Sequence, residues 1–255
     1  MRMIYDIGMY DGEDTGYYLE CGYSVLAVEA NPVFVERAQS KFKAAIDRGT
    51  LTIVHAAISA QGAGERVDLT LCGDDPGSSS IFLSRISDRQ PSGICSVPAI
   101  TLPELFRDYG IPEYMKVDIE GADRFCILAL TRAARPPYVS FEAGEDAEEL
   151  LAHLSTLGYG RFKIISVLSF RELENQRSIA DRVRLRLMRY MGFSDPQRIR
   201  RRGRFFVAGS SSGPVPWETD GKWRSAIETR NRLQSARASH ALSGWYDIHA
   251  QCDGL

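Results

Sequence analysis

The chain has 255 residues, of which 44% are hydrophobic, a size that favours one α/β domain with a single main core. Its 31 Lys and Arg against 33 Asp and Glu give a formal charge of −2, so the molecule as a whole has no pull toward nucleic acid or an anionic membrane. No stretch approaches the roughly 18 apolar residues of a membrane span, and no apolar signal segment leads the sequence. We therefore expect a soluble, cytoplasmic protein without a membrane partner.

Short β-rich segments alternate with helical segments along most of the chain. The segments expected to be strands are residues 3–7, 25–28, 51–55, 115–119, 138–141 and 162–167. Helices are expected between them, because Asn31-Pro32 places a cap residue and then proline at a helix start, and Thr101 with Glu104 has the spacing of a capping box. The alternation predicts an α/β fold in which helices cover a mostly parallel sheet.

The charge distribution changes after residue 160. Residues 161–204 hold 13 Lys and Arg against 4 Asp and Glu, so the rest of the chain holds 18 against 29. Residues 174–191 are predicted to form an amphipathic helix with arginines on one side, and Arg204–Val207 is predicted to be the last strand. The basic segment is a candidate surface for phosphates, or a solvated face, or one that docks on acidic parts of the same protein.

These changes divide the chain. We assign residues 1–209 to a main domain that contains an arginine-rich insertion at 171–203. Residues 210–216 are rich in Ser, Gly and Pro, and three tryptophans follow among polar residues. Residues 210–255 are therefore predicted to be a linker and tail.

A glycine-bearing turn follows the first predicted strand. Gly8 and Gly12 stand in a D-x-G-x-x-x-G spacing that begins at Asp6, and a helix with free N–H groups follows them. Glycine permits tight turning and close approach of a ligand to the backbone. Because the spacing lacks the G-x-G-x-x-G pattern of pyrophosphate recognition, it favours a smaller anion such as an amino-acid carboxylate, although a purely structural turn has the same composition.

Glu29 ends the second predicted strand, 17 residues after Gly12. An acid at this place can accept hydrogen bonds from both hydroxyls of an adenosine ribose. A solvated strand end is the alternative, but the helix start at Asn31 favours a side chain that points into the crevice at the carboxyl ends of the strands. The glycine turn and this acid together indicate an adenosine-containing cofactor.

Further acids follow the next two predicted strands. If the strand at 115–119 stays extended, Lys116, Asp118 and Glu120 lie on one side of it, while Glu142 closes the strand after it. Asp118 is then expected to face the ligand crevice. The alternative is that Lys116 and Glu120 form a structural ion pair.

In this order the motifs resemble the FkbM-type methyltransferases, a class I S-adenosylmethionine-dependent family whose members largely methylate oxygen on sugars, polyketides and related molecules. The segments that carry the resemblance are Asp6-Ile-Gly8 with Gly12 and Thr15, Val28-Glu-Ala-Asn-Pro32, Ala57-Ile-Ser59, Ser78-Ser-Ser-Ile81, Thr101-Leu102 and Lys116-Val-Asp-Ile-Glu-Gly-Ala122. The family implies a Rossmann-like fold with about seven strands, the last one antiparallel, and helices on both faces. One departure is Gly8-Met9-Tyr10, which stands where Gly-Ala-Asn is usual.

The resemblance also implies a site. S-adenosylmethionine is expected to contact Asp6, Gly8, Gly12, Thr15, Glu29, Asn31, Ala57 and Asp118, and the acceptor is expected to contact Ser79 and Ser80. Asp118, assisted by Glu120 or Glu142, would accept or orient the proton of the acceptor hydroxyl. The same three acids could also hold Mg²⁺, because hard oxygen ligands suit that ion.

The sequence thus predicts a methyltransferase that acts on a hydroxyl of a sugar or another small metabolite. A nucleic-acid methyltransferase or RNA-binding module would instead use the arginines at 198–204 on phosphates. An NAD-dependent oxidoreductase would share the glycine turn and Glu29, yet no Ser/Tyr/Lys or His/Asp catalytic arrangement accompanies them. A cofactor-binding protein without catalysis would use the tail as an interaction arm.

Overall fold

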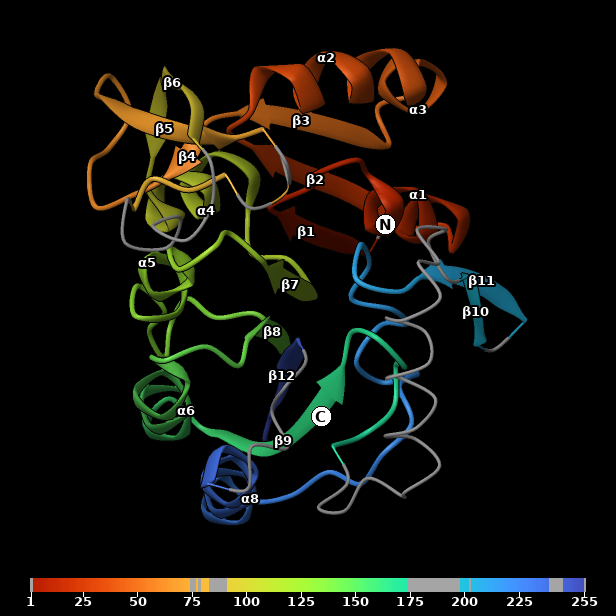
Figure 1. Ribbon diagram of the computed structural model, residues 1–255, viewed down its shortest axis with the longest axis vertical. Helices are drawn as coiled ribbons and strands as arrows, with labels where there is room; N and C mark the ends of the chain where they lie inside the picture. Colours follow the sequence, from red (N-terminus) through yellow and green to blue (C-terminus); the bar gives the residue numbers. More distant parts are fainter. Residues whose placement is uncertain are drawn as a thin grey trace.

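The computed structural model describes residues 2–73, 77, 79–82, 91–173, 198–201, 203–238 and 245–254. The strands of its main sheet are β1 (Met3–Ile7), β2 (Ser24–Glu29), β3 (Leu51–His55), β7 (Tyr114–Val117), β8 (Tyr138–Glu142), β9 (Tyr159–Ser166) and β12 (Tyr246–Cys252). They lie in the order β3-β2-β1-β7-β8-β12-β9 (Figure 1). Neighbours from β3 to β8 are parallel, whereas β12 is antiparallel to both β8 and β9. The predicted Rossmann-like fold class is confirmed.

Helices cover both faces of this sheet. They are α1 (Glu13–Glu20), α2 (Pro32–Lys41), α3 (Lys43–Asp47), α4 (Leu102–Tyr109), α5 (Asp123–Ile127), α6 (Ala147–Thr156) and α8 (Ala226–Ala238). Because side chains alternate along a strand, Tyr5 and Ile7 of β1 join a core with α4, α5, α6 and α8, while Ile4 joins a second core with α1, α2 and α3. The sheet is thus buried on both sides, as an α/β fold requires.

The caps expected for two of these helices are present. The Asn31 side chain accepts a hydrogen bond from the Val33 N–H at the start of α2, and Thr101 and Glu104 form the complete capping box of α4. A small sheet of β4 (Ala57–Ile58), β6 (Pro91–Ile100) and β5 (Arg66–Cys72), in that order, has a third cluster of apolar residues of its own. Among the described residues, no helix is long and apolar enough to cross a membrane.

The antiparallel strand of the main sheet comes from the end of the chain. The expectation that Arg204–Val207 is the last strand is wrong: it is β11, which among the described strands pairs with β10 (Arg198–Arg201) in a separate two-stranded sheet (Figure 1). Phe206 of β11 packs instead on Tyr17 of α1, with ring centroids 4.9 Å apart. Strand β12 takes the expected place, so residues 210–255 contribute a central strand where a linker and tail were expected.

The last part of the chain also covers the second face of the sheet. The Trp217 ring packs near Tyr138 of β8, with ring centroids 4.8 Å apart, and Val215 lies in the same core as α1. Residues 174–191, predicted to form an amphipathic helix, lie outside the described residues. Of the basic segment 161–204, the structure describes residues 161–173, 198–201, 203 and 204.

Candidate active site

A cavity of about 220 Å³ opens at the carboxyl ends of the parallel strands. Its wall includes Gly8 after β1, Glu29 at the end of β2, Asp118 after β7 and Glu142 at the end of β8. Strand β12 runs the opposite way, so its start reaches the same edge and adds Asp247. This is the edge at which open α/β sheets bind their ligands.

Gly8 sits where two backbone segments approach closely. Its φ is +85°, its N–H donates to the Val28 carbonyl oxygen at 3.0 Å, and a Cβ built on it would lie 1.8 Å from the Asp118 carbonyl oxygen. A side chain therefore has no room here. Gly12 is the N-cap of α1 with a φ of +78°, and a Cβ there would lie 2.6 Å from the Phe42 ring, so its role is in helix packing.

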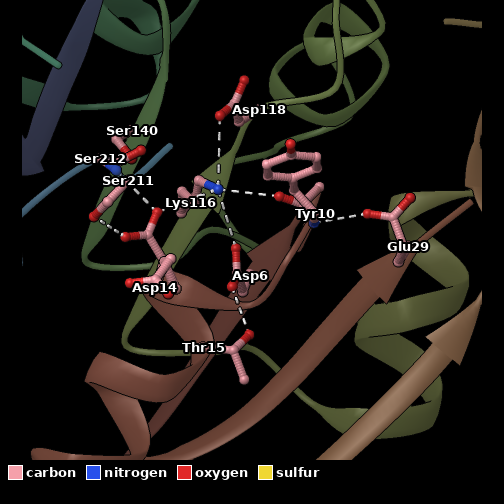
Figure 2. A network of polar contacts seen from close by, with 12 residues as sticks. Asp6, Tyr10, Asp14, Thr15, Glu29, Lys116, Asp118, Ser140, Ser211 and Ser212 are labelled. Carbon is pink, nitrogen blue, oxygen red and sulfur yellow. Dashed lines mark hydrogen bonds and ion pairs between the residues drawn. The ribbon is translucent and has the colours of Figure 1, made fainter. Parts of the chain in front are cut away.

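Glu29 is held in one orientation by the backbone. Its two carboxylate oxygens accept hydrogen bonds from the N–H groups of Tyr10 and Asn31, both at 2.8 Å. Figure 2 shows the bond from Tyr10. Burial raises the pKa of Glu29 to about 7 in spite of these bonds. Each carboxylate oxygen has a second lone pair, so the side chain can still accept hydrogen bonds from a diol in the cavity.

A buried lysine forms the centre of the polar network. Lys116 Nζ lies 3.3 Å from Asp6, 3.4 Å from Asp14 and 3.7 Å from Asp118, and it donates to the Gly8 carbonyl oxygen at 3.0 Å (Figure 2). Burial alone lowers its pKa, but attraction by these carboxylates raises the pKa of Lys116 well above its usual value. The lysine is therefore charged, and it ties β7 to the glycine turn.

The structure separates the expected cofactor contacts into two groups. Gly8, Glu29, Asn31, Ala57 and Asp118 line the cavity, whereas Asp6, Gly12 and Thr15 do not. The Thr15 hydroxyl donates to the fully buried Asp6 carboxylate at 2.6 Å, beneath Lys116. Asp6 and Thr15 thus lie on the side of Lys116 that faces away from the cavity. In this structure they are not placed to contact a ligand in the cavity directly.

The three predicted catalytic acids meet at the cavity, but by another route than an extended strand. Strand β7 ends at Val117, and Glu120 has a φ of +50°, so the alternation expected for 115–119 is wrong. Asp118, Glu120 and Glu142 nevertheless all line the cavity, and the Asp118 side chain is 51% exposed. The alternative, a Lys116–Glu120 ion pair, is not observed, because the lysine pairs with aspartates instead.

The predicted acceptor residues also line the cavity, next to strand β5 of the small sheet. Ser79 and Ser80 line the cavity, and the Ser80 hydroxyl donates to the Glu120 carbonyl oxygen at 2.9 Å, which joins this loop to the turn after β7. Ser78 lies outside the described residues. The serines therefore shape the wall on the side of the small sheet.

The end of the chain supplies site residues that the sequence analysis missed. Asp247, Trp245 and residues 209–212 line the cavity, and Asp14 accepts hydrogen bonds from the Ser211 hydroxyl and, at 2.9 Å, from the Ser212 N–H. One signal was available: residues 246–252 read Tyr-Asp-Ile-His-Ala-Gln-Cys, an alternation of polar and apolar residues with a period of two.

The predicted magnesium site gains no support. Within the described ranges, no group of three or more His, Cys, Asp and Glu side chains is arranged to hold a metal ion. The Asp118 carboxylate already faces the ammonium group of Lys116.

Comparison with known proteins gives a family match over more than half of the chain. A family model described as the methyltransferase FkbM domain matches residues 6–162. No curated protein shows significant sequence similarity to the chain.

Three solved structures match the chain at low similarity. A precorrin-6y C5,15-methyltransferase from Geobacter metallireducens is 12% identical, with a TM-score of 0.42 over 99% of this chain and 80% of its own. A TehB-like SAM-dependent methyltransferase from Corynebacterium glutamicum is 13% identical, with a TM-score of 0.35 over 64% and 68%. A SAM-dependent methyltransferase from Thiobacillus denitrificans, solved with S-adenosyl-L-homocysteine, is 12% identical, with a TM-score of 0.33 over 98% and 85%. We carry no ligand or substrate over from such distant likenesses.

Proposed function

Because the chain belongs to the FkbM methyltransferase family, we propose that it moves a methyl group from S-adenosylmethionine to a hydroxyl of a small, uncharged molecule such as a sugar. The observation that carries this proposal is the position of Glu29. Its carboxylate lines the cavity, and its two backbone hydrogen bonds leave acceptor capacity for a ribose diol.

The rest of the cavity fits the donor as well. Val28, Phe34, Ala57, Leu69 and Ile81 provide an apolar wall beside Glu29, suited to a flat base. Gly8 lies between Glu29 and Asp118 along the sheet edge, since β1 lies between β2 and β7. We place the adenosine at Glu29 and the amino-acid end beside Gly8 and Lys116.

The chemistry needs little from the protein beyond placement. The donor supplies a methyl group that its sulfonium already activates, so the protein has to orient an acceptor oxygen and exclude water. Asp118 faces the cavity from the middle of the sheet edge and is half exposed, so its carboxylate can accept the acceptor's hydroxyl proton. Lys116 Nζ lies 3.7 Å from this carboxylate and helps to keep it at the edge of the cavity.

The charges of the cavity favour an uncharged acceptor. Of the described residues that line it, Lys116 is the sole cation, and three aspartates already surround it. The other charged residues in the wall are acids: Asp118, Glu120, Glu142, Asp247 and Glu29. A phosphate or carboxylate on the acceptor would be repelled, which argues against a nucleic-acid substrate in this cavity.

Two arginines of the β10–β11 sheet contact other parts of the same protein. Arg204 lies 3.8 Å from Glu20 and packs over the Tyr17 ring, and Arg201 donates to the Ser169 carbonyl oxygen at 2.6 Å. They do not line the cavity. These contacts favour docking on the acidic body of the protein over phosphate binding.

Thermal unfolding with ligands tests the proposal. S-adenosylhomocysteine at 100 times its dissociation constant should raise the free energy of unfolding by about 2.7 kcal/mol, whereas NAD at the same concentration should not. Glu29→Gln should weaken this effect, and Glu36→Gln, a change at an exposed glutamate on α2, should not. Stabilisation by NAD alone would refute the proposal.

A further inference from the structure

An excess of carboxylates surrounds the lysine of the site. Asp6 comes from β1, Asp14 from α1, Asp118 from the turn after β7, and Asp247 from β12, and all four lie close enough to Lys116 to influence its charge. If every group were ionised, four negative charges would face one positive charge in a largely buried space. Such a cluster favours either a bound proton or a cationic ligand.

Two members of the cluster show where the charge is unbalanced. Asp6 Oδ1 is buried and accepts no hydrogen bond from the described residues, although it faces Lys116 at 3.3 Å. Asp247 is only 7% exposed, lines the cavity, and lies opposite Glu142 in the strand register. Burial, followed by the charge of Asp118, raises the pKa of Asp247, and the hydroxyl of Ser212 and the charge of Lys116 oppose this rise.

We propose that this cluster responds to the charge of the methyl donor, so that Asp247 is ionised while the cationic donor is bound and protonated while its neutral thioether product is bound. The inference rests on the proposed function and adds a proton-holding residue to it. The charged groups that face Asp247 are Lys116, Asp118 and Asp14, with Glu142 on the neighbouring strand.

The charges balance through the reaction. The bond from the acceptor oxygen to the methyl carbon forms, the bond from sulfur to that carbon breaks, and its electron pair stays on sulfur. The positive charge of the sulfonium disappears, and the acceptor hydroxyl loses a proton. If that proton passes by way of Asp118 and stays on Asp247, the net charge within the site does not change, which avoids an unpaired charge in a buried space.

The affinities of the two ligands should depend differently on pH. Raising the pH disfavours protonation of Asp247, so it should weaken binding of the neutral product relative to binding of the cationic donor. The ratio of the two affinities should rise with pH by up to about tenfold per unit, the limit for one linked proton.

Calorimetry on the intact protein tests this without an acceptor. We would titrate S-adenosylmethionine and S-adenosylhomocysteine at about pH 6.5 and about pH 8.0, each in two buffers of different ionisation enthalpy, and obtain protons exchanged and affinities. The expected result is that the cationic ligand releases up to one proton more than the neutral ligand. Asp247→Asn, which keeps the shape of the protonated carboxyl, should abolish that difference, and the surface change Asp47→Asn should leave it intact.

Each outcome decides the inference. Equal proton release by the two ligands in the unmodified protein would overturn it, and so would a difference that persists in Asp247→Asn. The measurement on the unmodified protein does not depend on whether the variant folds. If neither ligand binds, the proposed function fails as well. If both ligands bind and release the same number of protons, only the inference is overturned.

Discussion

Replacing Gly8 with alanine should damage both the fold and the site. The added Cβ would lie 1.8 Å from the Asp118 carbonyl oxygen and 3.1 Å from Ile119, at a φ of +85° that suits glycine. Because the nearer atom belongs to the backbone, no side-chain rotation can relieve the contact. The glycine turn and the turn after β7 must move apart, and both line the cavity.

The chain offers a matched control that isolates the contact. Gly22 has nearly the same φ, +84°, but nothing lies within 4 Å of a Cβ built on it. Gly22→Ala should therefore cost only the conformational strain, about 1–2 kcal/mol. Gly8→Ala carries the same strain and adds the cost of overpacking, about 1–3 kcal/mol or more. We expect a total loss of about 2–5 kcal/mol, a large part of the roughly 5–15 kcal/mol typical of a folded domain.

Urea unfolding of the two variants and the unmodified protein measures these losses. Gly8→Ala should lower the midpoint more than Gly22→Ala at an unchanged slope, and it alone should weaken S-adenosylhomocysteine binding. If the two alanine variants lose equal stability and bind the ligand equally well, the close approach of the two turns does not hold as described.

Four further predictions concern other parts of the molecule. Affinity for S-adenosylhomocysteine, measured by calorimetry, should fall as the pH drops through about 7, because Glu29 then gains a proton and loses acceptor capacity; a flat profile would contradict this. Thr101→Ala should reduce the unfolding free energy by about 1 kcal/mol in a denaturant titration, through loss of the capping box. A chain ending at residue 209 should show no cooperative unfolding transition in circular dichroism, since it lacks β12. Trp245→Ala should raise KM for an acceptor while S-adenosylhomocysteine affinity stays unchanged, because this residue, 52% exposed, lines the cavity beside Gly209, near the start of β12.

The parallel part of the fold could be predicted because its signals are local. β-Rich segments, the Asn31-Pro32 start and the Thr101 capping box all act within a few residues of chain. The antiparallel strand could not be located in the same way. Strand β12 carries Asp247, His249 and Gln251 among its buried residues, so its composition resembles an exposed segment. Arg204–Val207 has more hydrophobic character, yet composition cannot say which strand it pairs with.

In the site, too, features set by local sequence could be predicted and contacts between distant segments could not. Glu29 and Gly8 were predictable, because a strand end and a glycine turn fix where they lie in this kind of fold. The partners of Lys116 were not, since Asp14 and Asp247 are distant in sequence and meet it only through the sheet order. The exclusion of Asp6 and Thr15 from the cavity wall also depends on packing, because Lys116 lies over Asp6 and separates it from the cavity.

A crystal structure with bound S-adenosylhomocysteine would test the central claim most directly. The account predicts that both ribose hydroxyls lie within hydrogen-bond distance of the Glu29 carboxylate, with the amino-acid end beside Gly8 and the sulfur facing Asp118. Ligand density in another part of the molecule, or a ribose directed away from Glu29, would contradict it.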